Sequence, residues 1–185
     1  MSHDARVMSS RFERLEARTV FEGGFVEICE GTFRHEDGGE VKRQWVAHPG
    51  AVGIVAHDGE DVWLVRQPRE AIGDPELLEL PAGKLDEEGE TPLECGVREL
   101  AEEIGKAAGN WEHLTTYYTS AGFTDEQCHI FLATGLSDEP GRQVEGERID
   151  IERHPLAELD ATIASCRDAK TIIGLQILRT RLAAG

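Results

Sequence analysis

The alternation of hydrophobic and polar positions predicts a series of short strands over the first half of the chain. We expect a strand wherever β-branched and apolar residues run between turn sequences. The segments that meet this condition are 20–31, 40–47, 51–56, 61–66 and 76–80. Two polar turns separate some of them, HEDGG at 35–39 and HDGE at 57–60. The second turn joins two apolar runs and therefore predicts a hairpin.

Segment 92–104 predicts a helix whose two ends are both marked. Thr91 can cap the start, Pro92 occupies the first helical position, and Glu94 completes a capping box. Gly105 is placed to end the helix. Four apolar residues recur at helical spacing and are expected to form its buried stripe, namely Leu93, Val97, Leu100 and Ile104. The internal glycine at position 96 indicates either a close backbone approach or a tolerated substitution.

The second half of the chain predicts more strands and then two closing helices. The strand candidates are 112–118, 128–133 and a segment around 147–152. The helices are expected near 156–166 and 169–183, the last of them opened by Asp168 as a good N-cap. This order of strands, one central helix, strands and helices predicts an α/β (α+β) fold, with helices packed on a mixed β-sheet.

Composition and charge restrict the class of protein. A chain of 185 residues with 39% hydrophobic residues suits one globular domain with at most a small appendage. No apolar run approaches the roughly 20 residues that span a bilayer, and the first residues lack the apolar core of a secretory signal. We therefore expect a cytoplasmic location and no membrane partner. The net charge of −17 repels nucleic acid phosphates, so no nucleic acid partner is expected.

The four cysteines are far apart in sequence and form no CxxC pair. This spacing favours free, buried thiols over a disulfide framework or a structural metal site. The residues concerned are Cys29, Cys95, Cys128 and Cys166.

The polar face of segment 92–104 is a candidate metal site. Glu99 and Glu103 are four residues apart and so point the same way, with Glu102 beside them. The alternative is a solvated acidic face in which Arg98 and Glu102 form an ordinary ion pair. Because the segment offers carboxylates and no histidine, a metal bound there would be Mg²⁺ or Mn²⁺ rather than Zn²⁺.

Segment 83–105 resembles the Nudix box, G-x5-E-x7-R-E-U-x-E-E-x-G-U, in which U is an apolar residue. Gly83 begins the pattern, Glu90 is its first glutamate, and residues 98–105 (RELAEEIG) supply its second half. Two departures are visible. Six residues rather than five separate Gly83 from Glu90, and Lys106 stands where an apolar residue is usual. Neither departure removes a charged residue of the pattern.

The resemblance implies a Nudix-type α/β/α sandwich and a Mg²⁺-dependent hydrolysis of a diphosphate linked to another group, with Mn²⁺ as an alternative cofactor. By position, Glu99 and Glu103 would be the principal metal ligands. Glu102 would assist them, and the main-chain carbonyl of Ala82 would be a further ligand. The residues that would support the box are Gly83, Glu90, Arg98 and Gly105.

Segments beyond the box resemble the ADP-ribose pyrophosphatase branch of this family. They are ELLELPAGKLDEEGE at 76–90, SAGFTDEQCHIFLATGL at 120–136, the E-x-E spacing within 144–149, and DAKTIIGLQILR at 168–179. The resemblance implies hydrolysis of ADP-ribose to AMP and ribose 5-phosphate. It implies a general base on the E-x-E loop, Glu145 or Glu147, with Glu102 or Glu126 as other candidates. Ala121 replaces the proline that often marks ADP-ribose specificity in this branch.

The branch forms homodimers in which N-terminal strands pair between subunits and help to build the adenosine pocket. We therefore expect 1–47 to serve dimerisation and the substrate pocket, and 48–185 to form the hydrolase domain. The substrate-binding candidates are Phe25, Arg43, Trp45, Arg66, Arg69, Glu79, Gly122 and Phe123. Core packing is the alternative for the aromatic residues, and plain solvent exposure is the alternative for the arginines.

Three other functions compete with ADP-ribose hydrolysis. The nearest is hydrolysis of another nucleoside diphosphate sugar, which is the same class of small-molecule substrate. A non-catalytic, ligand-binding Nudix domain is a second, but such regulators commonly lose box glutamates, and this chain keeps them all. Removal of oxidised nucleoside triphosphates is a third, and it fits the box but neither the E-x-E loop nor the N-terminal extension.

Overall fold

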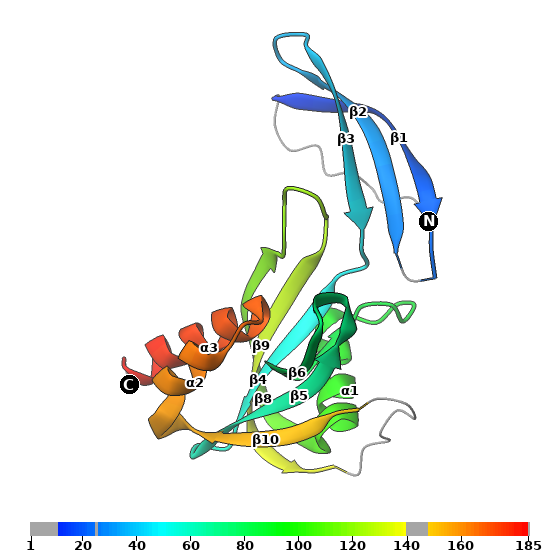
Figure 1. Ribbon diagram of the computed structural model, residues 1–185. Helices are drawn as coiled ribbons and strands as arrows, with labels where there is room; N and C mark the ends of the chain where they lie inside the picture. The colour runs from blue at the N-terminus through cyan, green and yellow to red at the C-terminus, as the bar shows by residue number, and fades with distance from the viewer. Residues whose placement is uncertain (1–10, 25, 140–147, 185) are drawn as a thin grey trace. The chain divides into compact units, whose positions relative to one another are not determined.

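The computed structural model describes residues 11–24, 26–139 and 148–184, and the chain divides into two compact units (Figure 1). The first, called here the N-terminal unit, comprises Met1–His48 and Ser120–Glu126. The second, called the sheet unit, comprises Pro49–Thr119 and Gln127–Gly185. The loop 120–126 therefore belongs with the first strands of the chain, although more than 70 residues separate them in sequence.

The N-terminal unit is built on an antiparallel three-stranded sheet in the order β1-β2-β3. Its strands are β1 (Phe12–Glu22), β2 (Glu27–His35) and β3 (Glu40–Ala47). The predicted single strand over 20–31 was wrong, because the chain turns between Glu22 and Glu27 and the Gly23 amide donates to the Val26 carbonyl at 2.8 Å. All of β1 is exposed, so its sequence lacks the alternation of apolar and polar residues that would predict a strand.

The sheet unit contains a seven-stranded sheet in the order β10-β5-β4-β9-β8, with β6 added to β5 and β7 added to β4. Its strands are β4 (Ala51–His57), β5 (Asp61–Arg69), β6 (Asp74–Glu79), β7 (Ala82–Lys84), β8 (Lys106–Tyr118), β9 (Gln127–Asp138) and β10 (Asp150–Pro155). β4 and β9 pair in parallel, and the other described pairs are antiparallel. The predicted mixed sheet is confirmed.

Helices cover both faces of this sheet (Figure 1). On one face lies α1 (Pro92–Ile104), and on the other lie α2 (Leu159–Ser165) and α3 (Ala169–Leu182). Single turns of 3₁₀ helix precede β6 and α2, at Glu70–Ile72 and Leu156–Glu158. Each face has its own buried cluster, with Leu100 of α1 in one and Leu175 of α3 in the other. This arrangement confirms the predicted α/β/α sandwich.

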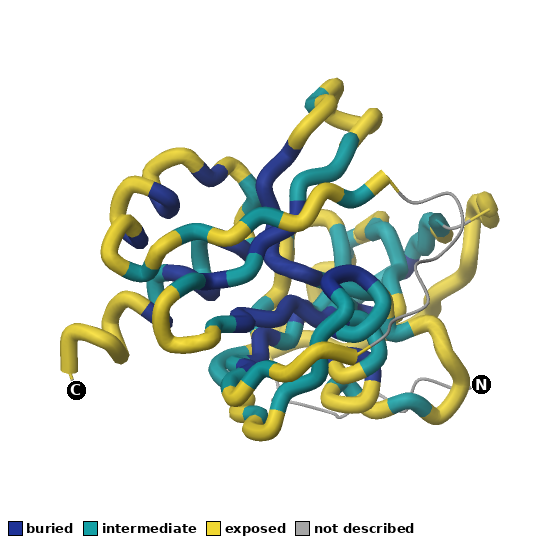
Figure 2. Tube along the Cα trace, turned by 90° about the horizontal axis from the view of Figure 1, so that it is seen from below, coloured by how far each residue is buried: buried dark blue, intermediate teal, exposed yellow. Residues whose placement is uncertain are grey.

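The central strand β4 explains why its sequence is a continuous apolar run rather than an alternating one. Val52 and Ile54 pack in the α1 cluster, whereas Val55 packs in the cluster under α2 and α3. A strand buried on both faces needs apolar residues at every position. Figure 2 shows such buried segments inside the sheet unit, with exposed positions at its turns.

The predicted ends of α1 are confirmed. The Thr91 hydroxyl accepts from the Glu94 amide at 3.3 Å, and the Glu94 carboxylate accepts from the Thr91 amide at 2.8 Å. Gly105 ends the helix with a φ of 64°, a left-handed conformation that favours glycine.

The predicted buried stripe of α1 is only half right. Leu100 and Ile104 are buried, but Leu93 and Val97 are 41% and 46% exposed. The reason lies at Gly96, where an added Cβ would come within 3.3 Å of Val52 and 3.4 Å of Trp111. The helix packs against the sheet at this glycine, and Leu93 and Val97 in its first two turns therefore lie toward solvent.

The predicted free thiols are confirmed. Cys95, Cys128 and Cys166 are buried in the sheet unit, while Cys29 in β2 is only half-buried. Within the described residues, none of the helices has the length and apolar character required to cross a bilayer.

Candidate active site

The strand β7 and the helix α1 place two predicted metal ligands, Ala82 and Glu103, in direct contact. Glu103, in the last turn of α1, is only 7% exposed. One of its carboxylate oxygens, Oε2, accepts the Ala82 amide at 2.9 Å. The carboxylate is thus fixed against the same residue whose carbonyl oxygen is the predicted main-chain ligand.

A second contact explains why the box begins with glycine. A Cβ built on Gly83 would lie 1.9 Å from Oε1 of Glu99, far inside van der Waals contact. Only glycine therefore allows the Glu99 carboxylate to lie against the backbone of β7. Together with the contact of Glu103 to Ala82, this brings the two principal predicted ligands to one short stretch of backbone.

Arg98 ties three glutamates of the box together. Its Nε and Nη2 donate to the two oxygens of Glu90, at 2.9 and 3.0 Å. Its Nη1 donates to Glu99 at 2.7 Å and to Glu102 at 3.1 Å. The hydrogen bonds that Arg98 donates to Glu90 lower the pKa of Glu90 and raise the pKa of Arg98. Arg98 therefore braces the loop and orients the helix carboxylates, as the resemblance implied.

The donor set fits a hard divalent cation in its chemistry. Carboxylates of Glu99, Glu102 and Glu103 and the carbonyl of Ala82 are oxygen donors, the type that Mg²⁺ and Mn²⁺ take in proteins. No three His, Cys, Asp or Glu side chains in the described part of the chain already converge as a metal-binding group. Glu99 and Glu102 point to Arg98 instead.

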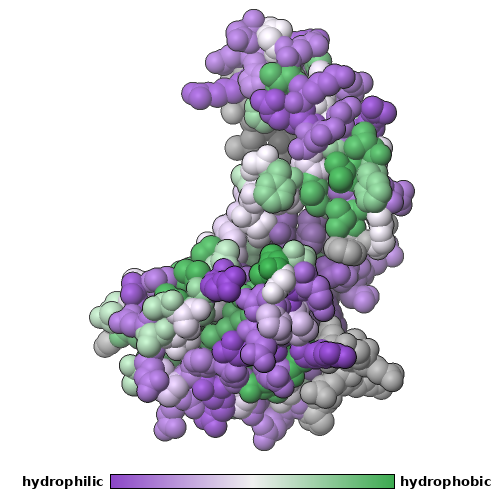
Figure 3. All heavy atoms as spheres, in the orientation of Figure 1, coloured by the Kyte–Doolittle hydropathy of each residue, from purple (hydrophilic) through white to green (hydrophobic). Residues whose placement is uncertain are grey.

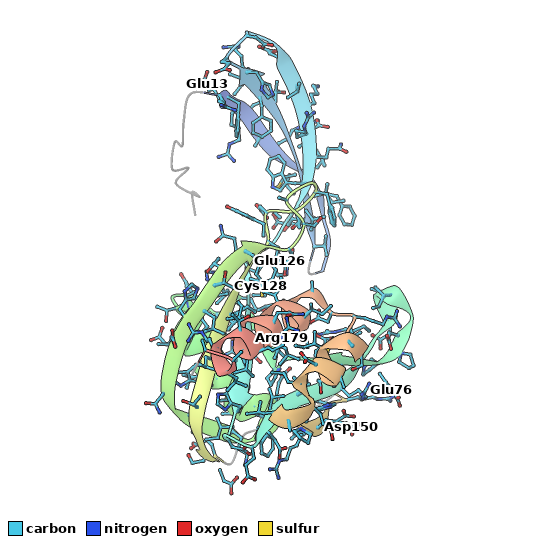
Figure 4. All side chains as sticks on the ribbon, turned by 90° about the vertical axis from the view of Figure 1, so that its left-hand side faces the viewer. Glu13, Glu76, Glu126, Cys128, Asp150 and Arg179 are labelled. Atoms are coloured by element: carbon cyan, nitrogen blue, oxygen red, sulfur yellow. The ribbon has the colours of Figure 1, made fainter. Side chains whose placement is uncertain are left out.

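The two arginines of β5 that were candidate phosphate ligands have different environments. Arg66 is held by Glu152 at 2.7 and 3.2 Å and also donates to the main-chain carbonyl of Glu76, a residue labelled in Figure 4. Arg69 donates its Nε and Nη2 to the two carboxylate oxygens of Glu79, at 2.5 and 2.8 Å, and 44% of its side chain is exposed. Hydrogen bonding to Glu79 raises the pKa of Arg69, and the charge of Glu103 adds to the effect. Of the two arginines, Arg69 is therefore the one whose pKa the charge of Glu103 also raises.

Glu79 itself is 1% exposed. It accepts from Arg69 and forms an ion pair with Lys170 of α3. Glu79 was a predicted substrate-binding residue, whereas Lys170 had no predicted role. The signal that could have found Lys170 is its place in the DAKT sequence that opens α3, although nothing in its spacing points to Glu79.

Four substrate-binding candidates belong to the N-terminal unit. Arg43 is exposed and donates to the Lys42 carbonyl at 2.9 Å. Trp45 packs edge-on against Phe33, with ring centroids 6.3 Å apart. Gly122 and Phe123 lie on the loop 120–126, and Phe123 is 60% exposed.

The loop 120–126 is fastened to the end of β3. The Val46 amide donates to the Phe123 carbonyl at 2.8 Å, and the Thr124 hydroxyl donates to the Val46 carbonyl at 2.9 Å. The Ser120 carbonyl accepts from the Phe123 amide at 3.0 Å, which closes a turn with Ala121 at its second position. Proline is favoured at that position of a turn. The turn is therefore formed without the proline that the branch usually has there.

The remaining candidate residues lie in different parts of the chain. Glu145 and Glu147, the candidate bases, lie outside the described residues, as does Phe25. Glu102, the other catalytic candidate, is 28% exposed in its side chain and contacts Arg98. Glu126 lies in the N-terminal unit, where it pairs with His48 at 3.4 Å.

The unusual Lys106 has a structural explanation. Its Nζ lies 4.4 Å from the centroid of the Trp63 ring and forms an ion pair with Asp138 at 2.5 Å. The lysine stem thus covers the aromatic ring as an apolar residue would, and its charge adds a cation–π contact. This departure from the box leaves the carboxylates of α1 untouched.

The NUDIX domain matches residues 47–172, which is more than half of the chain. The chain belongs to the Nudix family. The matched residues include the whole segment from Ala82 to Gly105 that carries the site described above.

Among Nudix relatives, the chain is similar to an ADP-ribose pyrophosphatase of Mycobacterium tuberculosis, at 38% identity over 80% of this chain and 72% of the relative. It is also similar to a methanol dehydrogenase activator of Bacillus methanolicus, at 35% identity over 95% of this chain and 98% of the relative. A crystal structure described as an ADP compounds hydrolase has the same Nudix fold, with a TM-score of 0.83 and 22% identity over 94% of this chain and 95% of that one.

Proposed function

We propose that this Nudix chain hydrolyses the pyrophosphate bond of ADP-ribose to AMP and ribose 5-phosphate. The observation that carries the proposal is the pair of contacts that bring Glu99 to Gly83 and Glu103 to Ala82. They provide a compact set of oxygen donors in a chain whose relatives include an ADP-ribose pyrophosphatase.

A divalent cation is part of this proposal, with Mg²⁺ first and Mn²⁺ as the alternative. Glu99 and Glu103, assisted by Glu102 and the carbonyl of Ala82, would hold it. A bound cation neutralises the charge of the diphosphate and makes water a better nucleophile. Arg98 would keep the carboxylates oriented, because its guanidinium spans Glu90, Glu99 and Glu102.

The general base is proposed to be Glu145 or Glu147, whose E-x-E spacing fits the branch. A carboxylate close to the attacking water can remove its proton. Glu102 is the alternative on α1 itself. Exchanging each of the three for glutamine, one at a time, would identify the base as the position with the largest loss of kcat.

Substrate recognition and dimerisation are proposed to involve the N-terminal unit. Arg43, Trp45, Gly122 and Phe123 offer a cation, two aromatic rings and a loop backbone for a nucleoside. Exposed apolar residues on β1 support pairing with a second copy of this chain, and Figure 3 shows hydrophobic side chains gathered on the surface of this unit. The exposed apolar residues of β1 are Phe12, Leu15, Val20 and Phe21. An exposed strand with apolar side chains favours pairing with another strand.

A second candidate is hydrolysis of another nucleoside diphosphate sugar, because Ala121 replaces the proline that often marks ADP-ribose specificity. The test is a panel of ADP-ribose, ADP-glucose, GDP-mannose and UDP-glucose with Mg²⁺, with the products identified by chromatography. We expect ADP-ribose to have the highest kcat/KM. A higher value for another sugar would move the proposal to that substrate, and no turnover on the panel would reject both.

A further inference from the structure

Two arginines on β5, three residues apart, make the same side-on ion pair with different partners. Arg66 pairs with Glu152, whose side chain is 33% exposed, and Arg69 pairs with Glu79, whose side chain is 1% exposed. An ion pair with a buried carboxylate is held more firmly than one in solvent, because screening by water is weaker there. Arg69 is therefore paired with the less screened carboxylate, whereas Arg66 has an additional hydrogen bond to the main-chain carbonyl of Glu76.

The buried carboxylate of Glu79 is itself anchored from the other side of the sheet. Lys170, near the start of α3, forms an ion pair with Glu79 and a second one with Asp168 at 3.1 Å. Asp168 caps α3 by accepting from the Thr171 amide at 3.0 Å and from its hydroxyl at 2.6 Å. The start of α3 is therefore a rigid support for Glu79.

The same support continues along the backbone that follows Glu79. The Thr171 hydroxyl accepts from the Leu80 amide at 2.8 Å, the Pro81 carbonyl accepts from the Ile54 amide at 2.8 Å, and the Ala82 amide donates to Glu103. Every residue from Glu79 to Ala82 is thus held by a hydrogen bond or an ion pair. One short segment connects the support at α3 to the box carboxylate.

We propose that Glu79 is a positioning residue that holds the Arg69 guanidinium at the segment leading to Ala82 and Glu103, ready to bind the diphosphate of the substrate. Glu79 engages Nε and Nη2 of Arg69, so Nη1 is left to donate to a phosphate oxygen. The partial exposure of Arg69 keeps this edge accessible. Because Glu79 is buried, it acts through Arg69 and does not touch the substrate. This inference rests on the proposed function only in that the ligand is a diphosphate.

The energetic reason is preorganisation. A free arginine side chain loses rotamer freedom when it binds, and this loss weakens binding. An arginine already fixed by a buried carboxylate has lost that freedom on folding. The charge of Lys170 matters as well, because it stabilises the ionised form of Glu79 that Arg69 requires.

The test compares Glu79→Gln, Arg69→Lys and the double variant, with Glu152→Gln as the matched control that releases Arg66 in the same way. Calorimetry measures the Kd for ADP and for a methylene-bridged analogue of ADP-ribose in the presence of Ca²⁺. Steady-state assays give KM and kcat on the preferred sugar nucleotide. We expect Glu79→Gln and Arg69→Lys each to raise Kd and KM about tenfold, with kcat changed less than threefold. The control should stay within twofold of the wild type.

The double variant shows whether Glu79 affects substrate binding only through Arg69. If Glu79 acts through Arg69, the double variant binds no more weakly than Arg69→Lys alone. Multiplied losses would overturn the proposal, as would wild-type affinity in either single variant. If Glu79→Gln does not fold, Arg69→Lys together with Glu79→Asp decides, since Glu79→Asp keeps the charge and should bind more tightly than Arg69→Lys.

The proposed function and this inference fail in different ways. A wild-type protein that binds ADP but does not hydrolyse ADP-ribose would reject the proposed substrate, and the Kd values for ADP would still decide the role of Glu79. A wild-type protein with no measurable affinity for ADP or the analogue would overturn the inference.

Discussion

The backbone of Gly83 and the carboxylate of Glu99 are so close that no side chain fits between them, since a Cβ at position 83 would lie 1.9 Å from Oε1. We expect Gly83→Ala to push the Glu99 carboxylate away and to lower kcat/KM at least about a hundredfold, because catalytic groups must be held within a fraction of an ångström. The control is Gly109→Ala, where an added Cβ meets the nearest atom at an ordinary 3.6 Å. Equal activity of the two variants would show that Glu99 has no role in this position.

Glu103→Gln tests the charge at the end of α1. The amide oxygen of glutamine can still accept from the Ala82 amide, so the fold should stay intact while the cation loses an anionic ligand. We expect kcat to fall at least about a hundredfold at saturating Mg²⁺, with the circular dichroism spectrum unchanged. Glu88→Gln, in the exposed loop before α1, is the matched control and should keep full activity. Normal turnover by Glu103→Gln would place the cation elsewhere.

Ala121→Pro tests whether the loop 120–126 keeps the shape that proline would impose. Ala121 occupies the second position of the turn closed by the hydrogen bond from Phe123 to Ser120. Proline there should raise stability by about 0.4–1 kcal/mol through the unfolded chain and leave the order of substrate preference unchanged. Differential scanning calorimetry and the substrate panel measure the two outcomes, with Ala121→Ser as the control. A lower Tm, or a new preferred substrate, would mean that the loop has a different conformation from the one described.

The thiols should react in two groups. Burial raises the pKa of Cys95 to about 12, with the charges of Glu90 and Glu99 adding to it, and burial also raises the pKa of Cys166. A thiol reagent such as dithionitrobenzoate should label the half-buried Cys29 first and the others only when the protein unfolds. Cys29→Ser should remove the fast phase. Rapid labelling of all four thiols in the native protein would contradict the burial of the sheet unit.

The ion pairs of Glu79 should make stability depend on acid pH. Burial raises the pKa of Glu79, but hydrogen bonds and charges from Arg69 and Lys170 outweigh it and leave the pKa below 4.5, the ordinary value. A lowered pKa stabilises the folded protein above pH 4.5, and this contribution is lost as the pH falls through the folded value. We expect Glu79→Gln to unfold more easily than the wild type by about 3 kcal/mol at pH 7. Urea unfolding at pH 7 and pH 3 should show the difference shrinking, and a constant difference would contradict the ionised state of Glu79.

The parts of the fold that sequence predicts well are those fixed by local chemistry. The ends of α1 follow from Thr91 and Gly105, because a cap and a left-handed glycine act within one turn. The turn at Gly23 is different. It joins two strands of which one, β1, has no buried residue to reveal it. The buried face of α1 was also mispredicted, because the sheet meets the helix at Gly96, and no periodicity of apolar residues encodes a contact made by a missing side chain.

The candidate site likewise combines residues that the sequence predicts with contacts that it does not. The pattern of the box was enough to select Glu99, Glu103 and Ala82, and the structure brings all three to one loop. The contact of Glu79 with Lys170 joins residues 91 positions apart, and no spacing in the sequence relates them. The difference between Arg66 and Arg69 is also tertiary, since Glu152 lies on β10 and Glu79 on β6, and both strands pair with β5.

The most direct test of the central claim is the release of AMP from ADP-ribose by the purified protein, measured by chromatography with Mg²⁺ and again after chelation. The oxygens gathered at Ala82, Glu99 and Glu103 predict AMP and ribose 5-phosphate in equal amounts, no turnover after chelation, and recovery when Mg²⁺ is restored. Undiminished turnover in the chelated sample, or no AMP at any Mg²⁺ concentration, would contradict the account.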